Sequence, residues 1–141
     1  MNEDLSVAQE IENKSGEGPN VDVPMAIKDK FNWGAFFLTW IWGCANKSYI
    51  TFLSFATFII AAIPFANLLY LPAQLGIRIW FGIKGNEWAW QNKKFESAEA
   101  FHSSQRAWAI GGTIWFCVTT IIGILFGIFA LLAIIGLAAQ N

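Results

Sequence analysis

The sequence predicts an all-α integral membrane protein, mainly because of how its charges are distributed. Two long blocks, residues 48–77 and 107–141, contain no charged residue, whereas nearly all Lys and Arg lie in the short stretches that flank them. The chain has 141 residues, is 55% hydrophobic and has a mean hydropathy of +0.45. A soluble domain of this size would leave too much apolar surface in water, so lipid is the expected solvent.

The first 25 residues differ from the rest of the chain. They carry six acidic residues against a single basic residue, Lys14, and almost no large apolar side chain. Such a segment cannot bury enough surface to offset its ordering entropy, so we expect residues 1–25 to form a disordered acidic tail. It lacks the basic start and apolar core of a signal peptide, so insertion would use internal segments. Residues 26–141 are then expected to form a single membrane domain.

Residues 31–45 are apolar and strongly aromatic. As a helix this segment would be about 22 Å long, shorter than the hydrocarbon core of about 30 Å. Trp33, Trp40 and Trp42 suit the headgroup boundary, where the ring is buried and the indole N–H stays hydrated. We therefore predict a short interfacial or re-entrant helix rather than a full span.

Residues 48–83 would form a helix of about 54 Å, which is too long for one span. Pro64 lies near the middle and supplies a turn. We predict a hairpin of two short antiparallel helices over residues 48–63 and 67–83. Pro72 removes one backbone hydrogen bond, so we expect a kink in the second helix.

Residues 86–106 are polar with aromatic interruptions. Gly85 suits a helix end, and Asn86 and Ser97 suit N-caps. Aromatic residues recur at spacings near seven and form one apolar stripe: Trp88, Phe95, Phe101 and Trp108. We predict one broken amphipathic helix on the membrane surface, with Trp88, Trp90 and Trp108 as further interfacial anchors.

Residues 107–139 contain no Pro and no polar turn cluster, which predicts one long transmembrane helix. A hairpin broken at Gly123 is the alternative. Small side chains share one face of this helix: Thr113, Cys117, Thr120, Gly123 and Gly127. The spacing from Gly123 to Gly127 lets another helix approach closely, either the Gln74 face of the same molecule or a second protomer.

The basic residues predict an orientation. If residues 31–45 stay at one surface, all the basic residues near the membrane fall on one side: Lys28, Lys30, Lys47, Lys84, Lys93, Lys94 and Arg106. The positive-inside rule then places the N-terminus and residues 84–106 in the cytoplasm and the C-terminus outside. A four-span chain with a C-terminal hairpin would return the C-terminus to the inside. Apart from Lys47, these residues form a basic rim suited to anionic lipid headgroups.

A polar stripe is expected on the second helix of the hairpin. Asn67, Tyr70, Gln74 and Arg78 share one face at helical spacing. Polar groups in lipid normally face a bundle interior, a water cavity or a partner, so one interpretation is a small hydrophilic path or ligand contact. The other is structural: Arg78 reaches the cytoplasmic headgroups, and the amides tie helices together.

The remaining reactive side chains do not predict an enzyme. Carboxylates and bases gather in the polar loop, but no nucleophile is arranged around them, so solvated helix charges are the ordinary explanation: Glu87, Glu96, Glu99, Lys93, Lys94 and His102. Cys44 and Cys117 form no CxxC pair, so we expect no zinc, no other metal and no cofactor. The basic residues are too few for nucleic acid binding.

Two motifs carry a resemblance. The run Phe31-Asn32-Trp33-Gly34-Ala35-Phe36-Phe37, with Trp40 and Trp42 following, fits the F-x-W-x-A-F-F part of the pattern F-x-W-x-A-F-F-x-x-x-W, and Gly82-Ile83-Lys84-Gly85-Asn86 fits G-x-x-G-N. Over about residues 27–108 the chain resembles a family of small bacterial inner-membrane proteins of unknown function. The resemblance implies a bacterial cytoplasmic membrane location. It implies no activity and no site residues, and the zinc ribbon of some relatives is absent here.

These observations favour a non-enzymatic membrane protein, an accessory or scaffolding component that acts through helix packing with itself or with a partner. The alternative is a subunit of a small transporter or pore that uses the face formed by Asn67, Gln74 and Arg78.

Overall fold

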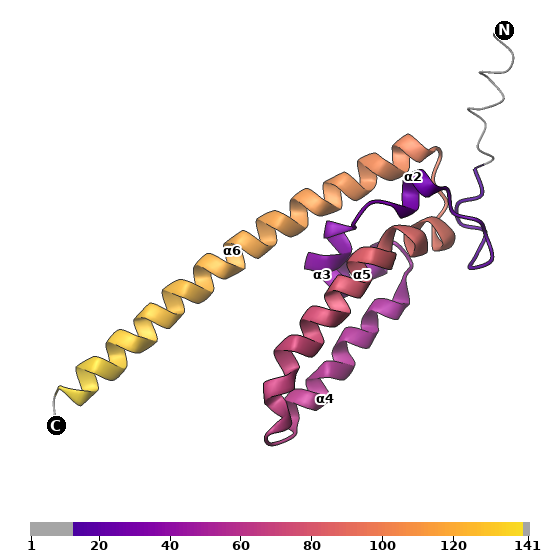
Figure 1. Ribbon diagram of the computed structural model, residues 1–141. Helices are drawn as coiled ribbons and strands as arrows, with labels where there is room; N and C mark the ends of the chain where they lie inside the picture. Colours follow the sequence, from indigo (N-terminus) through magenta and orange to yellow (C-terminus); the bar gives the residue numbers. More distant parts are fainter. Residues whose placement is uncertain (1–12, 140–141) are drawn as a thin grey trace, which may run out of the picture.

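The computed structural model describes residues 13–139, which contain helices and no strand (Figure 1). In chain order the elements are α2 (Met25–Lys28), α3 (Trp33–Ala45), the 3₁₀ helix η1 (Tyr49–Ala56), α4 (Thr57–Ala62), the 3₁₀ helix η2 (Ala66–Leu69), α5 (Tyr70–Asn92) and α6 (Ala98–Ala138). The all-helical prediction is therefore confirmed, as is the single long apolar helix at the C-terminal end.

The molecule has three parts, which we name by their residues. The head comprises residues 13–47 and 81–112, the hairpin residues 48–80, and the arm residues 113–139. The buried apolar side chains all lie in the head: Val23, Ile27, Ala35, Trp42, Phe81, Ala89, Trp90, Phe95 and Phe101. In Figure 1 the hairpin and the arm leave the head as two separate extensions that diverge from each other.

The first half of the hairpin is a 3₁₀ helix because its sequence repeats every three residues. Hydroxyl side chains recur at Ser48, Thr51, Ser54 and Thr57, and all four are buried. Three of the hydroxyls donate to the carbonyl three residues earlier, at distances of 2.9, 2.8 and 2.7 Å. The aromatic residue after each hydroxyl residue belongs to a second row of neighbouring rings: Tyr49, Phe52, Phe55 and Phe58. A 3₁₀ helix has three residues per turn, so both rows stay in register.

The arm is the second half of α6. The helix runs unbroken from Ala98 to Ala138, so the alternative hairpin at Gly123 is wrong. Residues 113–139 are all exposed. Among the described residues, α6 is the one helix long and apolar enough to cross a membrane. Its uncharged part after Arg106 would be about 48 Å long, compared with a hydrocarbon core of about 30 Å.

The N-terminal segment differs from the expected disordered tail. Residues 1–12 lie outside the described residues, but residues 13–25 pack against the rest of the head. Ser15 and Val23 are buried, and Gly16 N and Gly18 N donate to the carbonyls of Trp90 and Gln91 at 2.7 and 3.0 Å. These carbonyls belong to the last turn of α5, where a helix leaves its acceptors without internal partners. The segment is ordered because it supplies the missing donors.

The expected surface helix over residues 86–106 is also different. Helix α5 continues through Gly85 and Asn86 to Asn92, and the chain breaks only at residues 93–97. Ser97 is the N-cap of α6, and its hydroxyl accepts a hydrogen bond from Ala100 N at 3.1 Å. The apolar stripe predicted to face lipid instead supplies the core, since Phe95 and Phe101 are buried in the head.

The kink expected at Pro72 does not form. Pro72 lies in the first turn of α5, where a backbone N–H has no partner within the helix, so its ring costs no hydrogen bond. The break lies instead in α3, at Thr39, whose φ of 43° and ψ of −104° are non-helical. Positive φ is unfavourable for a β-branched residue, so this turn must be held by its surroundings.

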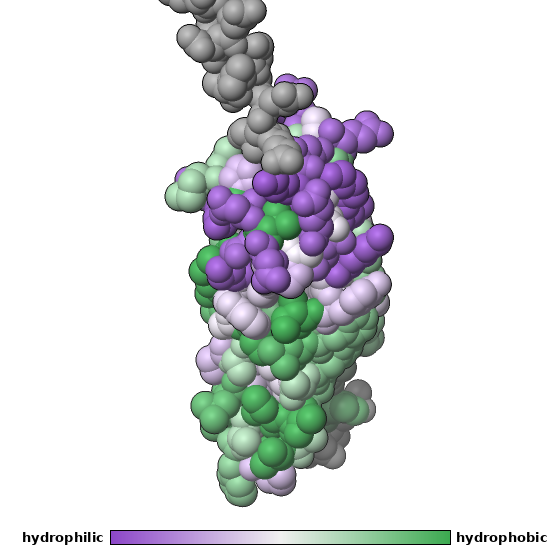
Figure 2. All heavy atoms as spheres, turned by 90° about the vertical axis from the view of Figure 1, so that its right-hand side faces the viewer, coloured by the Kyte–Doolittle hydropathy of each residue, from purple (hydrophilic) through white to green (hydrophobic). Residues whose placement is uncertain are grey.

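Hydrophilic side chains gather at one end of the molecule. Figure 2 shows them over the upper part of one face, with hydrophobic side chains over most of the rest. The reason lies in the sequence, because the hairpin up to Ile77 and the whole arm contain no charged residue.

Candidate functional site

Arg78 joins the hairpin to the break in α3. Its Nη1 donates to the carbonyl oxygens of both Phe36 and Phe37, each at 3.3 Å. These two carbonyls lie in the turn immediately before Thr39, where regular helical geometry ends. The guanidinium therefore acts as a cap for the first part of α3. Neither sequence interpretation, a ligand contact or a headgroup contact, anticipated this role.

The rest of the predicted polar face is also bonded inside the hairpin. Gln74 Nε2 donates to Thr57 Oγ1 at 2.7 Å and approaches Tyr70 Oη at 3.5 Å. The side chain of Asn67 lies outside the described part of the chain. Two buried oxygens, Thr39 Oγ1 and Gln74 Oε1, have no hydrogen-bond partner among the described residues. Tyr70 and Gln74 thus bond within the hairpin, whereas Arg78 bonds to α3.

A buried network of side-chain amides joins α3, α5 and α6. Asn32 Nδ2 donates to Asn86 Oδ1 at 2.7 Å and to Gln105 Oε1 at 3.0 Å. Gln105 Oε1 also accepts from Trp42 Nε1 at 2.9 Å, and Gln105 Nε2 donates to Asn46 Oδ1 at 3.0 Å. Asn32 Oδ1 caps α3 by accepting from Ala35 N at 2.8 Å. Gln105 is the centre of this network, because its amide joins α6 to Asn32, Trp42 and Asn46 along α3, whereas α5 enters the network through the bond between Asn86 and Asn32.

The two motifs behind the family resemblance meet at this network. A Cβ on Gly82 would collide with the Phe31 ring, and one on Gly85 would lie 2.8 Å from Ala35 Cβ. Asn86 Nδ2 also donates to Lys30 O at 2.6 Å. The motif residues therefore hold α3 against α5. Sequence reasoning missed the network, although amides at the ends of aromatic segments were a usable signal.

The predicted tryptophan anchors divide into two groups. Trp33 and Trp40 are exposed, at 51% and 44%, and Trp88 and Trp108 are half-buried against the core. Trp42 and Trp90 are buried, at 0% and 1%, which corrects their assignment as anchors. Trp42 Nε1 bonds to Gln105, whereas Trp90 Nε1 has no partner among residues 13–139. Both rings fill the head because the segment expected at the surface folds over them.

Most of the predicted headgroup lysines are engaged within the protein. Lys84 pairs with Glu87 at 2.8 Å, and Lys28 lies 3.9 Å from Asp22. Lys93 Nζ donates to Ala45 O at 3.2 Å, and Lys94 Nζ donates to Asn13 O at 2.7 Å. Lys30 and Arg106 differ, since the side chain of neither has an ion pair or a hydrogen bond to another residue among residues 13–139.

No acid–base set assembles around His102 within the described chain. Glu87 is paired with Lys84, and Glu99 lies in the first turn of α6, where a carboxylate is favourable for the helix dipole. Partial burial of the imidazole, together with the positive charge of Lys30, lowers the pKa of His102 below its usual value. The imidazole therefore favours the neutral form at pH 7.

The small-residue face of the arm has no partner within the described chain. A methyl group added to Gly123 or Gly127 would have no heavy atom of another segment within 4 Å, and Cys117 is exposed. Thr113 and Thr120 are exposed as well. The Gln74 face, one of the two expected partners, is instead occupied by Thr57 and its neighbours. The arm face is thus free for a second helix.

Comparison of the chain with protein-family models, with curated proteins and with solved structures finds no match in any of the three. The family resemblance stays a prediction carried by the residues of its two motifs, and the function must be argued from the geometry.

Proposed function

We propose that the protein is a small integral protein of the bacterial cytoplasmic membrane that acts without catalysis. It serves as an accessory or scaffolding component whose arm packs against another membrane helix. The observation that carries this proposal is the arm itself, residues 113–139, which is apolar and exposed throughout and has its small side chains on one face. In lipid, close helix approach over small residues is a main source of association.

The proposed orientation places the head in the cytoplasm and the end of the arm outside. The charged residues of the described chain lie in the head or, for Arg78, directly beneath it, and α6 is continuous, so it has no turn to bring the C-terminus back. A cysteine introduced at Asn141, in a variant without Cys44 and Cys117, should react with an impermeant maleimide added to intact cells. Protection of that cysteine until the cells are lysed would contradict the orientation.

The native Cys117 provides the test of packing. In a Cys44→Ser variant, mild oxidation of isolated membranes should produce a crosslink through Cys117, since this thiol lies on the small-residue face. Gly123→Leu with Gly127→Leu should reduce the crosslink at least tenfold. Gly136→Leu is the matched control: Gly136 also has no atom within 4 Å of its methyl position, but it lies on the opposite face of α6. An uncrosslinked monomer in every variant would contradict the proposal.

The alternative of a transporter or pore subunit has weaker support. Its candidate path would run along Gln74 and Arg78, whose donors are bonded to Thr57 and to the α3 carbonyls. Internal bonds of this kind are what a lone helix pair needs in lipid. Flux through proteoliposomes that is abolished by Arg78→Leu would favour the alternative over the packing proposal.

A further inference from the structure

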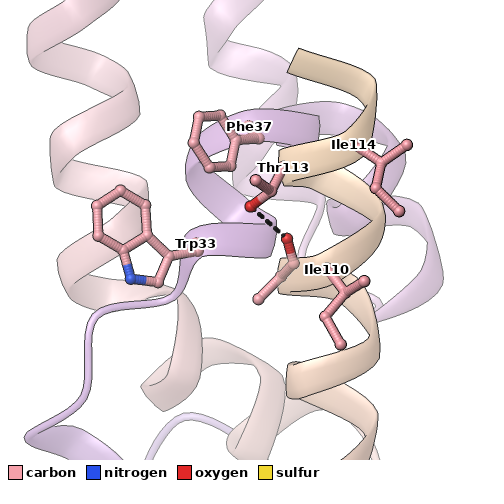
Figure 3. A pocket seen from close by; sticks show the side chains of 6 residues that line it. Trp33, Phe37, Ile110, Thr113 and Ile114 are labelled. Atoms are coloured by element: carbon pink, nitrogen blue, oxygen red, sulfur yellow. Dashed lines mark hydrogen bonds between the residues drawn. The ribbon is translucent and has the colours of Figure 1, made fainter. Parts of the chain in front are cut away.

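Two cavities lie side by side along the first turns of α6. The first is a polar pocket of about 250 Å³ with ten lining residues: Lys30, Phe31, Asn32, Trp33, Asn86, Phe101, His102, Gln105, Arg106 and Ala109. The second is an apolar groove of about 450 Å³ between α3 and α6, lined by Trp33, Phe37, Ala109, Ile110, Thr113 and Ile114 (Figure 3). Trp33 and Ala109 line both, so the polar pocket and the apolar groove adjoin each other.

The polar pocket has the charge of an anion site. Two of its lining residues, Lys30 and Arg106, are positively charged, His102 adds an imidazole, and none of the described lining residues is acidic. Lys30 and Arg106 are also the two basic residues of the rim that lack a partner in the described chain, whereas Lys28, Lys84, Lys93 and Lys94 have one. A guanidinium and an ammonium facing one cavity are well suited to a phosphate group.

The groove is suited to a hydrocarbon chain. Figure 3 shows Trp33 and Phe37 of α3 beside Ile110, Thr113 and Ile114 of α6. The rings of Trp33 and Phe37 stack, with centroids 5.7 Å apart. The Thr113 hydroxyl donates to Ala109 O at 2.9 Å, so its proton is already used within the helix. A polar ligand group would therefore gain little here.

The polar pocket and the apolar groove follow each other along α6 in the order in which the headgroup and the acyl chains of a lipid follow each other. His102 and Arg106 come first, followed by Ala109, Ile110 and Ile114, over about 18 Å of helix. The basic end lies in the head, at the hydrophilic end of the molecule (Figure 2), and the apolar end leads toward the arm. A lipid in the cytoplasmic leaflet would have the same direction under the proposed orientation.

We propose that this site binds one acidic phospholipid, with its phosphate between Lys30, His102 and Arg106 and one acyl chain in the groove beside Trp33 and Phe37. The proposal rests on the proposed membrane location and orientation but not on packing through the arm, because no residue of the small-residue face from Cys117 onward lines either cavity.

Native mass spectrometry of the full chain in detergent tests the headgroup half. Titration with dioleoyl phosphatidylglycerol should saturate at one tightly bound lipid, and phosphatidylcholine should bind at least tenfold more weakly. Lys30→Gln with Arg106→Gln should weaken phosphatidylglycerol binding at least tenfold. Lys84→Gln with Lys94→Gln removes the same charge outside the pocket and should leave binding unchanged. Equal losses in both double variants would overturn the site, since they would indicate general attraction by charge.

The acyl half needs its own measurement. Ala109→Phe narrows the groove, so it should weaken binding of dioleoyl phosphatidylglycerol while leaving short-chain dihexanoyl phosphatidylglycerol much less affected. Inorganic phosphate is the competing source of the same headgroup chemistry. If phosphate alone displaces the lipid at micromolar concentration and Ala109→Phe has no effect, the pocket binds a free anion and the lipid proposal is wrong. Unchanged circular dichroism and melting temperature of each variant show that the fold is intact.

Discussion

Six of the eight glycines in the described head have surroundings opposite to those of the three glycines in the arm, the exceptions in the head being Gly18 and Gly111. In the head, a methyl group on Gly34 would lie 2.6 Å from Trp108 Cβ, and one on Gly112 would lie 3.0 Å from Phe37 Cβ. In the arm, Gly123, Gly127 and Gly136 have nothing within 4 Å. The same residue type therefore marks a close contact already made in one region and a surface open to a partner in the other.

This difference separates the residues that build the fold from those available for function. The head packs its close-contact glycines, its buried amides, Trp42 and Trp90 within itself, so substitutions of these residues should act on stability. The arm has no described neighbour along most of its length, so substitutions there should act on association and leave stability in detergent unchanged. The predictions below test this division, beginning with the largest effect.

Gly82→Leu should prevent the head from folding. The new side chain would occupy the space of the Phe31 ring, so we expect a cost well above the value of about 1–3 kcal/mol that is typical of overpacking. Gly136→Leu, the same change in the arm, should leave the thermal melting temperature in detergent unchanged. Size-exclusion chromatography and melting of the two variants make the comparison. Phe31→Ala should partly restore folding of Gly82→Leu, because it removes the ring that the new leucine would overlap. A stable Gly82→Leu single variant would contradict the packing described for the head.

Gln105→Ala should be the next most damaging change. It leaves Trp42 Nε1 and Asn46 Oδ1 buried without their partner, and each buried unpaired group costs about 1–3 kcal/mol. The expected loss is about 2–4 kcal/mol, with a shift in tryptophan fluorescence as Trp42 loses its hydrogen bond. Thr113→Ala is the control on the same helix, where an exposed hydroxyl bonds only to its own backbone, and it should cost less than about 0.5 kcal/mol. Equal losses would mean that the amide network contributes nothing specific.

Composition alone predicted the apolar arm, but it could not predict the head. A long helix is the simplest structure for an uncharged run without Pro, and residues 107–138 are part of one. The head depends instead on contacts between distant segments, such as Asn32 with Asn86 and Gly16 with Trp90, which no local pattern encodes. The aromatic stripe was predicted as one helical face, but Phe95 lies in the break between α5 and α6, and a stripe of this kind can face lipid or a core. For Phe95 and Phe101 the break at residues 93–97 decided between the two.

The 3₁₀ helix of the hairpin was predictable and was missed. A hydroxyl residue followed by an aromatic residue occurs four times at a spacing of three, from Ser48 to Phe58, which is the period of a 3₁₀ helix. The candidate polar face was identified by position, but its role was not. Arg78 bonds to carbonyls beside Thr39, and nothing in the sequence marks Thr39 as a break.

Arg78→Met should have a moderate effect, because Arg78 connects the head to the hairpin. The variant keeps most of the side-chain volume and loses the two bonds to Phe36 O and Phe37 O. Both bonds are long, at 3.3 Å, so we expect a loss of about 1–2 kcal/mol. Arg106→Met removes the same charge from the head surface and should cost less than about 0.5 kcal/mol. Cleavage by protease near Thr39 should increase in Arg78→Met only. An increase in both variants would mean that the lost positive charge, and not the lost cap on α3, causes the effect.

Phe65→Gly should produce the smallest change, and its sign is the informative result. Phe65 forms the tip of the hairpin with φ of 64° and is 91% exposed, so it contributes strain and little packing. Glycine adopts positive φ without that penalty, and we expect a gain of about 0.5 kcal/mol in detergent. Leu68→Gly, three residues later and 82% exposed, lies in η2 and should instead lose stability, because there glycine only adds freedom to the unfolded chain. If the melting temperature falls in both variants, the loss of apolar side-chain surface, and not the backbone conformation, determines stability at this exposed end of the hairpin.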